Sequence, residues 1–198
     1  MSALLNRLTR DHRRFGRIMT LLESSVARFH GGEEPDYELL CELLEYVVDY
    51  ADQVHHPSEE LIFAAMREVL DRDGPPLGVD QAELSRAIAR LHAQHRQLEE
   101  RNRAFRDALE GIVHEEVLSR DTVTEQGNAA VALMRAHIEE EERRVFLAAG
   151  ALLSDADWER LERQAPSAAD PVFGQLDPLR FRALYDYLKD DLDAEDAE

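Results

Sequence analysis

The stretch Val54–Phe63 pairs two histidines with two glutamates at helical spacing, and no other feature constrains the fold as strongly. His55 stands four residues before Glu59. His56 stands four residues before Glu60. In a helix, residues four apart project from one face, about one turn from each other. An imidazole nitrogen beside a carboxylate oxygen makes half of a site for iron, manganese or zinc. The stretch therefore predicts a helix that carries metal ligands.

A second copy of this pattern lies far along the chain, in the run from His137 to Phe146, where Glu141 follows His137 by four residues. One such pair would mean little, because 42 of the 198 residues are acidic. Both copies, however, continue into apolar residues and reach a phenylalanine, which is typical of a helix that faces the core. Two half-sites together predict one dinuclear site.

The composition excludes several classes of function. The formal charge of −19 argues against nucleic acid and against anionic membrane surfaces, because both require a basic surface. A single cysteine, Cys41, rules out an intrachain disulfide framework and a cysteine-based zinc finger. The N-terminus has no apolar signal segment, and no run approaches the ~18 apolar residues of a membrane span. We therefore expect a cytoplasmic protein.

Apolar residues recur at steps of three and four along four long segments, which predicts four amphipathic helices. The segments cover residues 3–30, 36–71, 80 to about 111, and 122–150. Pro57 lies inside the second segment, where a proline removes a backbone hydrogen bond and usually kinks the helix. Short connections make successive helices antiparallel. We predict an all-α fold, with an up-down-up-down four-helix bundle over residues 1–150.

Residues 151–198 are predicted to form a short C-terminal helical extension with an acidic tail. The runs from Ser154 to Leu161 and from Asp177 to Phe181 each begin with a residue that favours helix N-termini. The acidic tail from Asp190 onward is predicted to be disordered. Within the bundle, Asp80 and Thr122 are the predicted N-terminal caps of the third and fourth helices.

Each long segment carries one histidine on its apolar face, and these four follow one another at intervals of 40 to 43 residues: His12, His55, His95 and His137. In an antiparallel bundle, residues equally far from their shared connection lie at the same height. The four rings can therefore meet, provided that the third helix ends near Gly111. Burying such imidazoles together with carboxylates would be costly without a bound cation.

Taken together, these segments resemble the hemerythrin-like, HHE cation-binding domain family. The residues that carry the resemblance are Asp11-His12, Tyr46 to Phe63, Gln94-His95-Arg96 and His137 to Phe146. The resemblance covers residues 1 to about 150 and implies a four-helix bundle with two non-heme irons bridged by carboxylates. It assigns the metal ligands as His12, His55, Glu59, His95, His137 and Glu141, with Glu59 and Glu141 as the bridges.

Three further residues stay open as ligands. His56 and Glu60 could replace His55 and Glu59, because Phe63 comes one residue earlier in its run than Phe146 does. Oxygen carriers of the family use a fifth histidine, one turn before the ligand of the third helix. Here His92 stands three residues before His95 instead of four. Without His92, one iron would have an extra open position, which favours reaction over reversible carriage. Manganese and zinc remain alternatives to iron.

The leading functional hypothesis is a non-heme di-iron protein that binds or senses a small oxidant, such as dioxygen, peroxide or nitric oxide. A di-iron enzyme for peroxide disproportionation or iron oxidation is the first alternative. A ferritin-type oxidase is disfavoured because no Glu-x-x-His occurs, and a zinc protease because Leu118 replaces the second histidine of His114-Glu115. The second alternative is a metal-stabilised interaction or regulatory module that docks through its C-terminal helices. The sequence identifies no protein partner.

Overall fold

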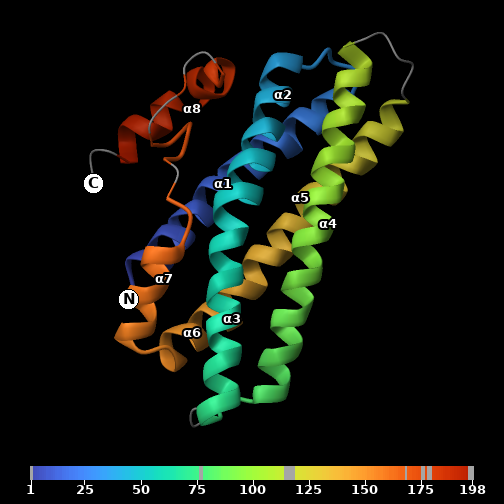
Figure 1. Cartoon of the computed structure of the whole chain (residues 1–198). Helices are drawn as coiled ribbons and strands as arrows, with labels where there is room; N and C mark the ends of the chain where they lie inside the picture. Colours follow the sequence, from blue (N-terminus) through green and yellow to red (C-terminus); the bar gives the residue numbers. More distant parts are fainter. Residues whose placement is uncertain are drawn as a thin grey trace.

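The structure is a computed structural model that describes residues 2–75, 78–113, 119–167, 169–174, 177 and 180–195, with backbone alone for 110–113 and 190–195. Every element in this part of the chain is a helix, and the predicted all-α fold is confirmed (Figure 1). The His114–Leu118 run weighed above lies outside the described residues.

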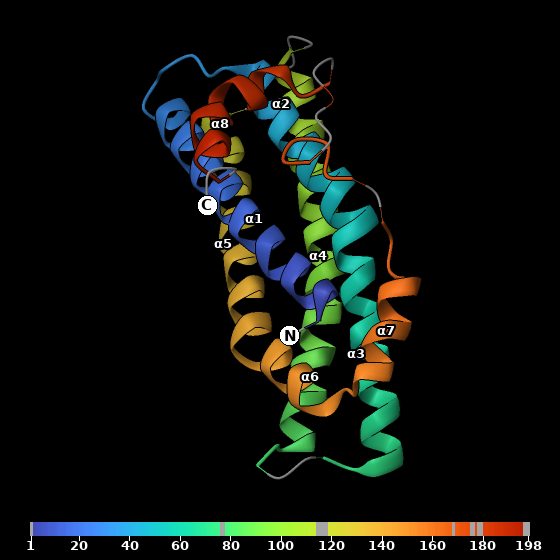
Figure 2. The same ribbon diagram turned by 90° about the vertical axis from the view of Figure 1, so that its left-hand side faces the viewer.

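Four long helical segments form the bundle, each called a rod below because its helical turns are continuous. Successive rods run in opposite directions, as predicted (Figures 1 and 2). The first rod is α1 (Ala3–His30), and the third is α4 (Gln81–Val113). The second is continuous through α2 (Tyr37–Tyr46), the π-helical stretch η1 (Val47–His55) and α3 (His56–Asp73). The fourth is continuous through α5 (Arg120–Glu140), the π-helical stretch η2 (Glu141–Val145) and α6 (Phe146–Leu152).

The helix boundaries agree with most of the predicted ones. Asp80 accepts hydrogen bonds from the backbone N–H groups of Ala82 (2.9 Å) and Glu83 (3.0 Å), as expected of a cap. The backbone of α4 stays helical through Gly111. The predicted cap Thr122 is wrong. Ser119 caps α5 instead, and its Oγ accepts from the N–H of Thr122 at 3.1 Å, because a cap bonds to the third residue after it.

The irregularity in the second rod lies before Pro57. The sequence predicts a kink at this proline, whereas the structure shows π-helical turns over Val47–His55, which end two residues earlier. In a π-helix each N–H bonds to the carbonyl five residues back, and the N–H of His56 accordingly bonds to Ala51. These wider turns reduce the angle between adjacent side chains, so that both His55 and His56 are buried.

Two hydrophobic clusters fill the bundle, one above the other. The upper cluster includes Phe15, Val54, Leu98 and Met134, and the lower cluster includes Leu8, Ile62, Leu91 and Val145. On every rod the chain passes from one cluster to the other across the segment that carries a candidate histidine: His12, His55, His95 or His137. The polar side chains therefore form a layer between two apolar ones.

The C-terminal extension contains α7 (Asp155–Gln164) and α8 (Arg182–Glu195), both packed against the outside of the bundle (Figures 1 and 2). Ser154 caps α7, with a reciprocal bond to Asp157, as predicted. The helix predicted at Asp177–Phe181 begins only at Arg182. The tail predicted to be disordered from Asp190 is helical as far as Glu195, because α8 continues through it; residues 196–198 lie outside the described part.

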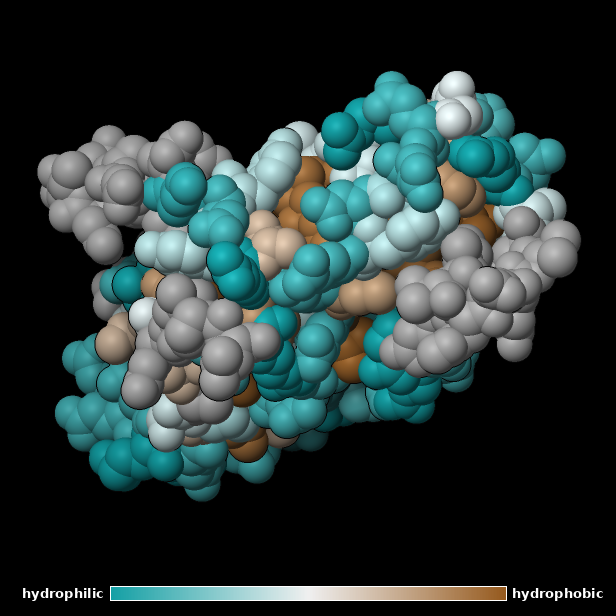
Figure 3. All heavy atoms as spheres, turned by 90° about the horizontal axis from the view of Figure 1, so that it is seen from above, coloured by the Kyte–Doolittle hydropathy of each residue, from teal (hydrophilic) through white to brown (hydrophobic). Residues whose placement is uncertain are grey.

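The apolar face of α8 is what fixes this helix to the bundle. Phe181, just before it, and Leu184 and Leu188 on it are buried in the upper cluster, and the N–H of Leu184 donates to Glu42 at 2.8 Å. The face seen from above is mostly hydrophilic, with apolar side chains visible between the polar ones (Figure 3). None of the described helices is long and apolar enough to cross a membrane.

Candidate metal centre

Seven buried polar residues form two overlapping groups of candidate ligands, and within each group the ligand atoms lie within 4.8 Å of one another. The inner group consists of His12, His55, Glu59 and Glu141. The groove-side group, named for the surface groove that borders it, consists of His56, Glu59, His95 and His137. Glu59 belongs to both groups, so that the two groups form one continuous cluster in which two ions would share this carboxylate.

All six residues assigned by the resemblance lie in these groups: His12, His55, Glu59, His95, His137 and Glu141. Of the three residues left open, His56 joins the groove-side group, while Glu60 and His92 belong to neither. The two histidines of the doublet lie in different groups, His55 in the inner group and His56 in the groove-side group. Metal binding by these residues itself stays a prediction.

The carboxylate of Glu59 lies between the two groups. Its Oε1 is 2.9 Å from Nε2 of His55 and 3.4 Å from Nε2 of His12. Its Oε2 is 3.3 Å from Nε2 of His95. One oxygen thus faces each group, as a bridging carboxylate requires. The side chain is fully buried, so that no water competes with these contacts from outside.

Glu141 also contacts histidines of both groups. Its Oε2 is 3.3 Å from Nε2 of His12 and 3.2 Å from Nε2 of His137, and its Oε1 is 3.8 Å from Nε2 of His95. The residue is the first of the π-helical stretch η2, whose wider turns parallel those of η1 beside His55. Such π-turns inside helices are frequently found at functional sites.

Glu60 and His92 form a second layer on the groove side. Oε1 of Glu60 accepts hydrogen bonds from Nδ1 of His92 at 2.7 Å and from Nδ1 of His95 at 2.8 Å. The side chain of His92 is 52% exposed. Its spacing of three residues from His95 leaves it beside that ring on the surface. Among the described residues, Glu60 is the side chain that connects His92 to the cluster.

Every histidine of the two groups presents Nδ1 to an oxygen outside the cluster. Hydrogen bonds join Nδ1 to Glu142 for His12 (3.1 Å), to Asp11 for His55 (3.3 Å), to Glu60 for His95 (2.8 Å) and to Gln94 for His137 (3.2 Å), while Oδ1 of Asp52 lies at ion-pair distance from Nδ1 of His56 (3.2 Å). An oxygen at Nδ1 holds a proton on that nitrogen and leaves Nε2 as the ligand atom. The five rings are therefore held in the orientation and tautomer that metal ligation needs.

The inward-facing atoms of the cluster have no hydrogen-bond partner among the described residues. They are Nε2 of His12, His56, His95 and His137, and both oxygens of Glu59 and of Glu141, all buried. Each unsatisfied buried polar atom costs about 1–3 kcal/mol, and more for a charged group. Divalent cations that accept both imidazole and carboxylate donors would satisfy all of these atoms at once. The residues present thus fit a pair of such cations.

The electrostatics of the cluster lead to the same conclusion. Burial acts to raise the pKa of Glu59, but the surrounding histidines, His55 foremost, hold it well below its usual value. Burial acts to lower the pKa of His95, yet Glu141, Glu59 and Glu60 raise it to about 11. Burial dominates at His137 and lowers its pKa to about 4. Protons on selected imidazoles thus balance the buried carboxylates, and a bound cation would displace them.

Access from solvent differs between the two groups. A surface groove of about 460 Å³ borders the groove-side group and is lined by His56 and His95, together with His92, Arg96 and Glu99. The inner group is covered by aromatic rings. Phe146 stacks on His12 with 5.2 Å between ring centroids, and Phe15 meets His55 edge-on at 4.9 Å. A small molecule entering through the groove meets the groove-side group first.

Sequence reasoning missed the outer acceptors. Asp52 precedes His56 by four residues, the same spacing that links the ligand pairs, and could have been found from it. Asp11 and Gln94 stand beside His12 and His95 in the chain, but each bonds to a histidine of another rod. Spacing within one helix carries no signal for such contacts.

The comparisons with known proteins agree with this geometry. The sequence model described as the hemerythrin HHE cation binding domain matches residues 3–149. That range contains both groups of candidate ligands and ends before α7 and α8. No curated protein and no solved structure shows a match to the chain.

Proposed function

The chain belongs to the hemerythrin HHE cation-binding domain family, and from this premise we propose that it is a non-heme di-iron protein that binds or senses a small oxidant. The oxidants considered are dioxygen, peroxide and nitric oxide. One observation carries the proposal: buried imidazole nitrogens and carboxylate oxygens of the two groups converge without partners of their own, and Glu59 joins them.

The donor set favours iron. Imidazole and carboxylate donors together suit iron and manganese as well as zinc, and soft thiolate ligands are absent from both groups. A pair of ferrous ions, when bound, supplies electrons to a small oxidant, which zinc cannot do. Each group offers four side chains, fewer than the six donors of an octahedral ion, so that room remains for a small ligand.

The residues of this chain divide the remaining tasks. The groove beside His56 and His95 admits the small ligand. Asp11, Asp52 and the other outer oxygens hold the rings in place, which keeps the ligand geometry fixed when the charge of the centre changes. Phe146 excludes water from the inner group. The arrangement suits a centre that is open on one side and protected on the other.

The test is the metal content of the chain purified without oxygen, followed by visible spectra before and after oxygen, peroxide or nitric oxide is added. We expect two irons per chain and a spectral change with at least one oxidant. Fewer than two irons after reconstitution, or iron that responds to none of these molecules, would overturn the proposal.

A di-iron enzyme is the second candidate, because the groove brings solvent to one group only. Peroxide disproportionation and iron oxidation both require repeated entry and release of a small substrate. Steady-state consumption of peroxide by the reconstituted chain separates the two candidates. A sensor or carrier reacts once per centre, whereas an enzyme continues to turn over.

A further inference from the structure

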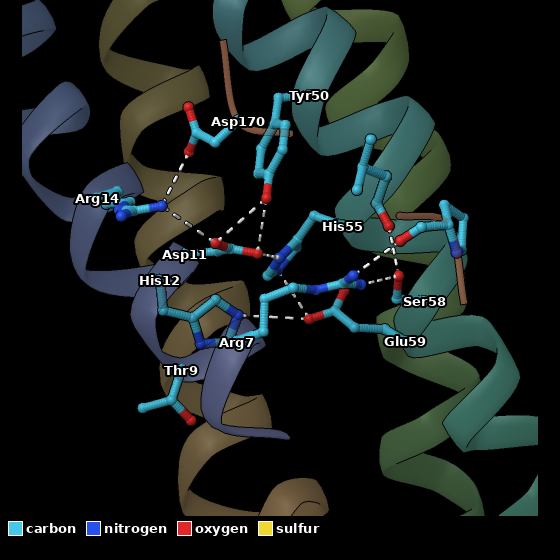
Figure 4. Close-up of polar contacts among 12 residues, drawn as sticks. Arg7, Thr9, Asp11, His12, Arg14, Tyr50, His55, Ser58, Glu59 and Asp170 are labelled. Carbon is cyan, nitrogen blue, oxygen red and sulfur yellow. Dashed lines mark hydrogen bonds and ion pairs between the residues drawn. The ribbon is translucent and has the colours of Figure 1, made fainter. Parts of the chain in front are cut away.

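A tight turn in the C-terminal extension, Asp170–Gly174, lies against the bundle beside the inner group, outside the residues that match the family (Figure 4). Oδ1 of Asp170 accepts from the N–H groups of Val172 (2.9 Å) and Phe173 (2.8 Å). The N–H of Gly174 donates to the carbonyl of Asp170 at 3.0 Å, and a Cβ at Gly174 would lie only 2.9 Å from that oxygen. The turn therefore needs glycine there and fixes the Asp170 carboxylate.

The second oxygen of this carboxylate accepts hydrogen bonds from side chains of two different rods. Oδ2 of Asp170 accepts from Nη1 of Arg14 on α1 at 3.1 Å and from the hydroxyl of Tyr46 on α2 at 3.0 Å. Arg14 also lies over the ring of Phe173, at 4.9 Å from its centroid. Asp170 and Tyr46 are both buried, so that the bonds form away from water and are worth more than surface contacts.

From these partners the contacts continue to His55. Tyr50 stacks on Tyr46, with 5.7 Å between centroids, and its hydroxyl donates to Asp11 at 3.4 Å. Nη1 of Arg14 is 3.9 Å from Oδ1 of Asp11. Oδ2 of Asp11 is in turn 3.3 Å from Nδ1 of His55. Figure 4 shows the part of this path that runs from Asp170 through Arg14 and Asp11 to His55.

Arg14 thus lies between two buried carboxylates that compete for its charge. It is 3.1 Å from Asp170 and 3.9 Å from Asp11, so Asp170 holds the guanidinium more closely. If Asp170 loses its charge, Arg14 is left with Asp11 as its anionic partner, and the attraction between them shortens the longer contact. That movement draws Asp11 away from Nδ1 of His55.

A separate contact ties the extension to the other side of the inner group. The carbonyl of Pro166 accepts from Nη1 of Arg7 at 2.7 Å, and Nη2 of Arg7 donates to Oγ of Ser58 at 2.5 Å. Ser58 precedes Glu59, the carboxylate shared by both groups. The extension therefore reaches the surroundings of both His55 and Glu59.

We propose that Asp170 is a positioning residue of the metal centre. Through Arg14, Tyr46 and Tyr50 it sets the position of Asp11, and Asp11 holds His55 with Nε2 directed at the inner group. This inference rests on the proposed function, because it concerns how that centre is held. It assigns a role at the site to a part of the chain that lies beyond the family domain.

The first experiment titrates the full-length, metal-free chain with Fe²⁺ in the absence of oxygen and follows both binding steps by calorimetry. For Asp170→Asn, which keeps the size of the side chain, we expect one step to weaken by about 10-fold and the other to stay unchanged. Removing a direct hydrogen-bond partner of a ligand costs about 10–100-fold in affinity, and Asp170, which acts on Asp11 through Arg14 and the tyrosines, should lie at the lower end.

The matched control is Glu162→Gln. Glu162 on α7 accepts from the N–H groups of Ala3 (2.8 Å) and Leu4 (3.3 Å), so that it also fastens the extension to α1. No contact connects it to Arg14, Tyr46 or Asp11 among the bonds that the described residues form. We expect this variant to bind Fe²⁺ in both steps as the unmodified chain does.

A double-mutant cycle distinguishes positioning from simple docking. If Asp170 acts through Asp11, Asp170→Asn should weaken binding in the unmodified chain but have no further effect on top of Asp11→Asn. Should Asp170→Asn not fold, Tyr46→Phe removes one bond to the same oxygen, keeps the ring, and should weaken the same step to a smaller extent.

Two outcomes overturn the inference. One is an Asp170→Asn chain that unfolds at a lower temperature yet binds both ions with normal affinity. The other is a loss of affinity that is just as large in the Asp11→Asn background. Failure of the proposed function is recognised separately, because the unmodified chain would then bind fewer than two irons.

Discussion

The two halves of the candidate centre share Glu59 but differ in composition and in surroundings. The inner group has two histidines and two glutamates, under the rings of Phe15 and Phe146. The groove-side group has three histidines and one glutamate and borders a surface groove. From this difference we propose that the inner half keeps its ion and that the groove-side half meets a ligand from solvent.

The acceptors of His55, His56 and His95 follow the same division, whereas Glu142, the acceptor of His12 on the inner side, has a side chain that is 41% exposed. On the inner side, Asp11 is 1% exposed and is held by Tyr50 and Arg14. On the groove side, the side chains of Asp52 and Glu60 are 16% and 30% exposed. A buried acceptor in a network is more rigid than a partly solvated one. We therefore expect the inner ion to exchange more slowly than the groove-side ion.

The largest effect on metal binding is expected from Glu59→Gln, because Glu59 is the residue common to both groups. The amide keeps the shape but lacks the charge that balances two cations. Both ions should bind at least about 100-fold more weakly, since loss of a mere outer partner already costs about 10–100-fold. The measurement is iron per chain after reconstitution and gel filtration.

The neighbouring Glu60→Gln is the control for that variant. Glu60 has the same chemistry and accepts from His95, but it belongs to neither group. It should retain two irons with a moderate loss of affinity on the groove side alone. Equal iron content in the two variants would show that Glu59 is not the shared ligand.

The next largest effect is the loss of one ion, which tests whether the two groups bind their ions separately. His56→Ala removes one imidazole from the groove-side group and leaves the inner group intact, so that one iron per chain should remain. His92→Ala is the matched control, because His92 lines the same groove without belonging to a group, and it should keep two irons. A His56→Ala chain that keeps both ions would contradict the division drawn here.

Part of this arrangement could be predicted from the sequence, and part of it could not. The common height of His12, His55, His95 and His137 could be predicted, because it depends only on helix length and on distance from each loop. The burial of both His55 and His56 could not be predicted. It depends on the π-helical turns of η1, and a widened turn of this kind leaves no trace in the apolar periodicity.

The contacts between rods were also beyond prediction. Asp11 bonds to His55 across 44 residues of chain, and Gln94 bonds to His137 across 43. Such pairs are set by the rotation of each helix about its axis, which spacing within a single helix does not give. The path from Asp170 to His55 has the same origin, since it joins three separate parts of the chain.

A third effect concerns protons and involves both groups. In the inner group, Glu141, Glu142 and Glu59 hold the pKa of His12 well above its usual value despite burial. The pKa of His95 is raised to about 11 in the metal-free chain, despite burial, by Glu141, Glu59 and Glu60. This imidazole therefore holds a proton at neutral pH, and an ion must displace it. Affinity for Fe²⁺ should rise with pH between about 6 and 8, by about tenfold per pH unit for each proton displaced.

Calorimetry in buffers of different ionisation enthalpy counts the protons released. His137, whose pKa burial lowers to about 4, is already neutral and should release none. Affinity that is independent of pH in this range would show that the histidines of the metal-free cluster carry no protons to displace.

The smallest effect tests the cover over the inner group. Phe146 is 5% exposed and stacks on His12, so that Phe146→Leu leaves an apolar but incomplete cover. Its cost in folding stability should be about 1 kcal/mol, as for swaps between large apolar residues. Both ions should still bind, but a chelator should remove the inner ion a few times faster, because water reaches His12 more easily.

Leu147→Ala, on the exposed neighbouring position, controls for a general change in α6 and should leave both release rates unchanged. If Phe146→Leu accelerates loss of the groove-side ion instead, the assignment of a closed and an open half must be reversed.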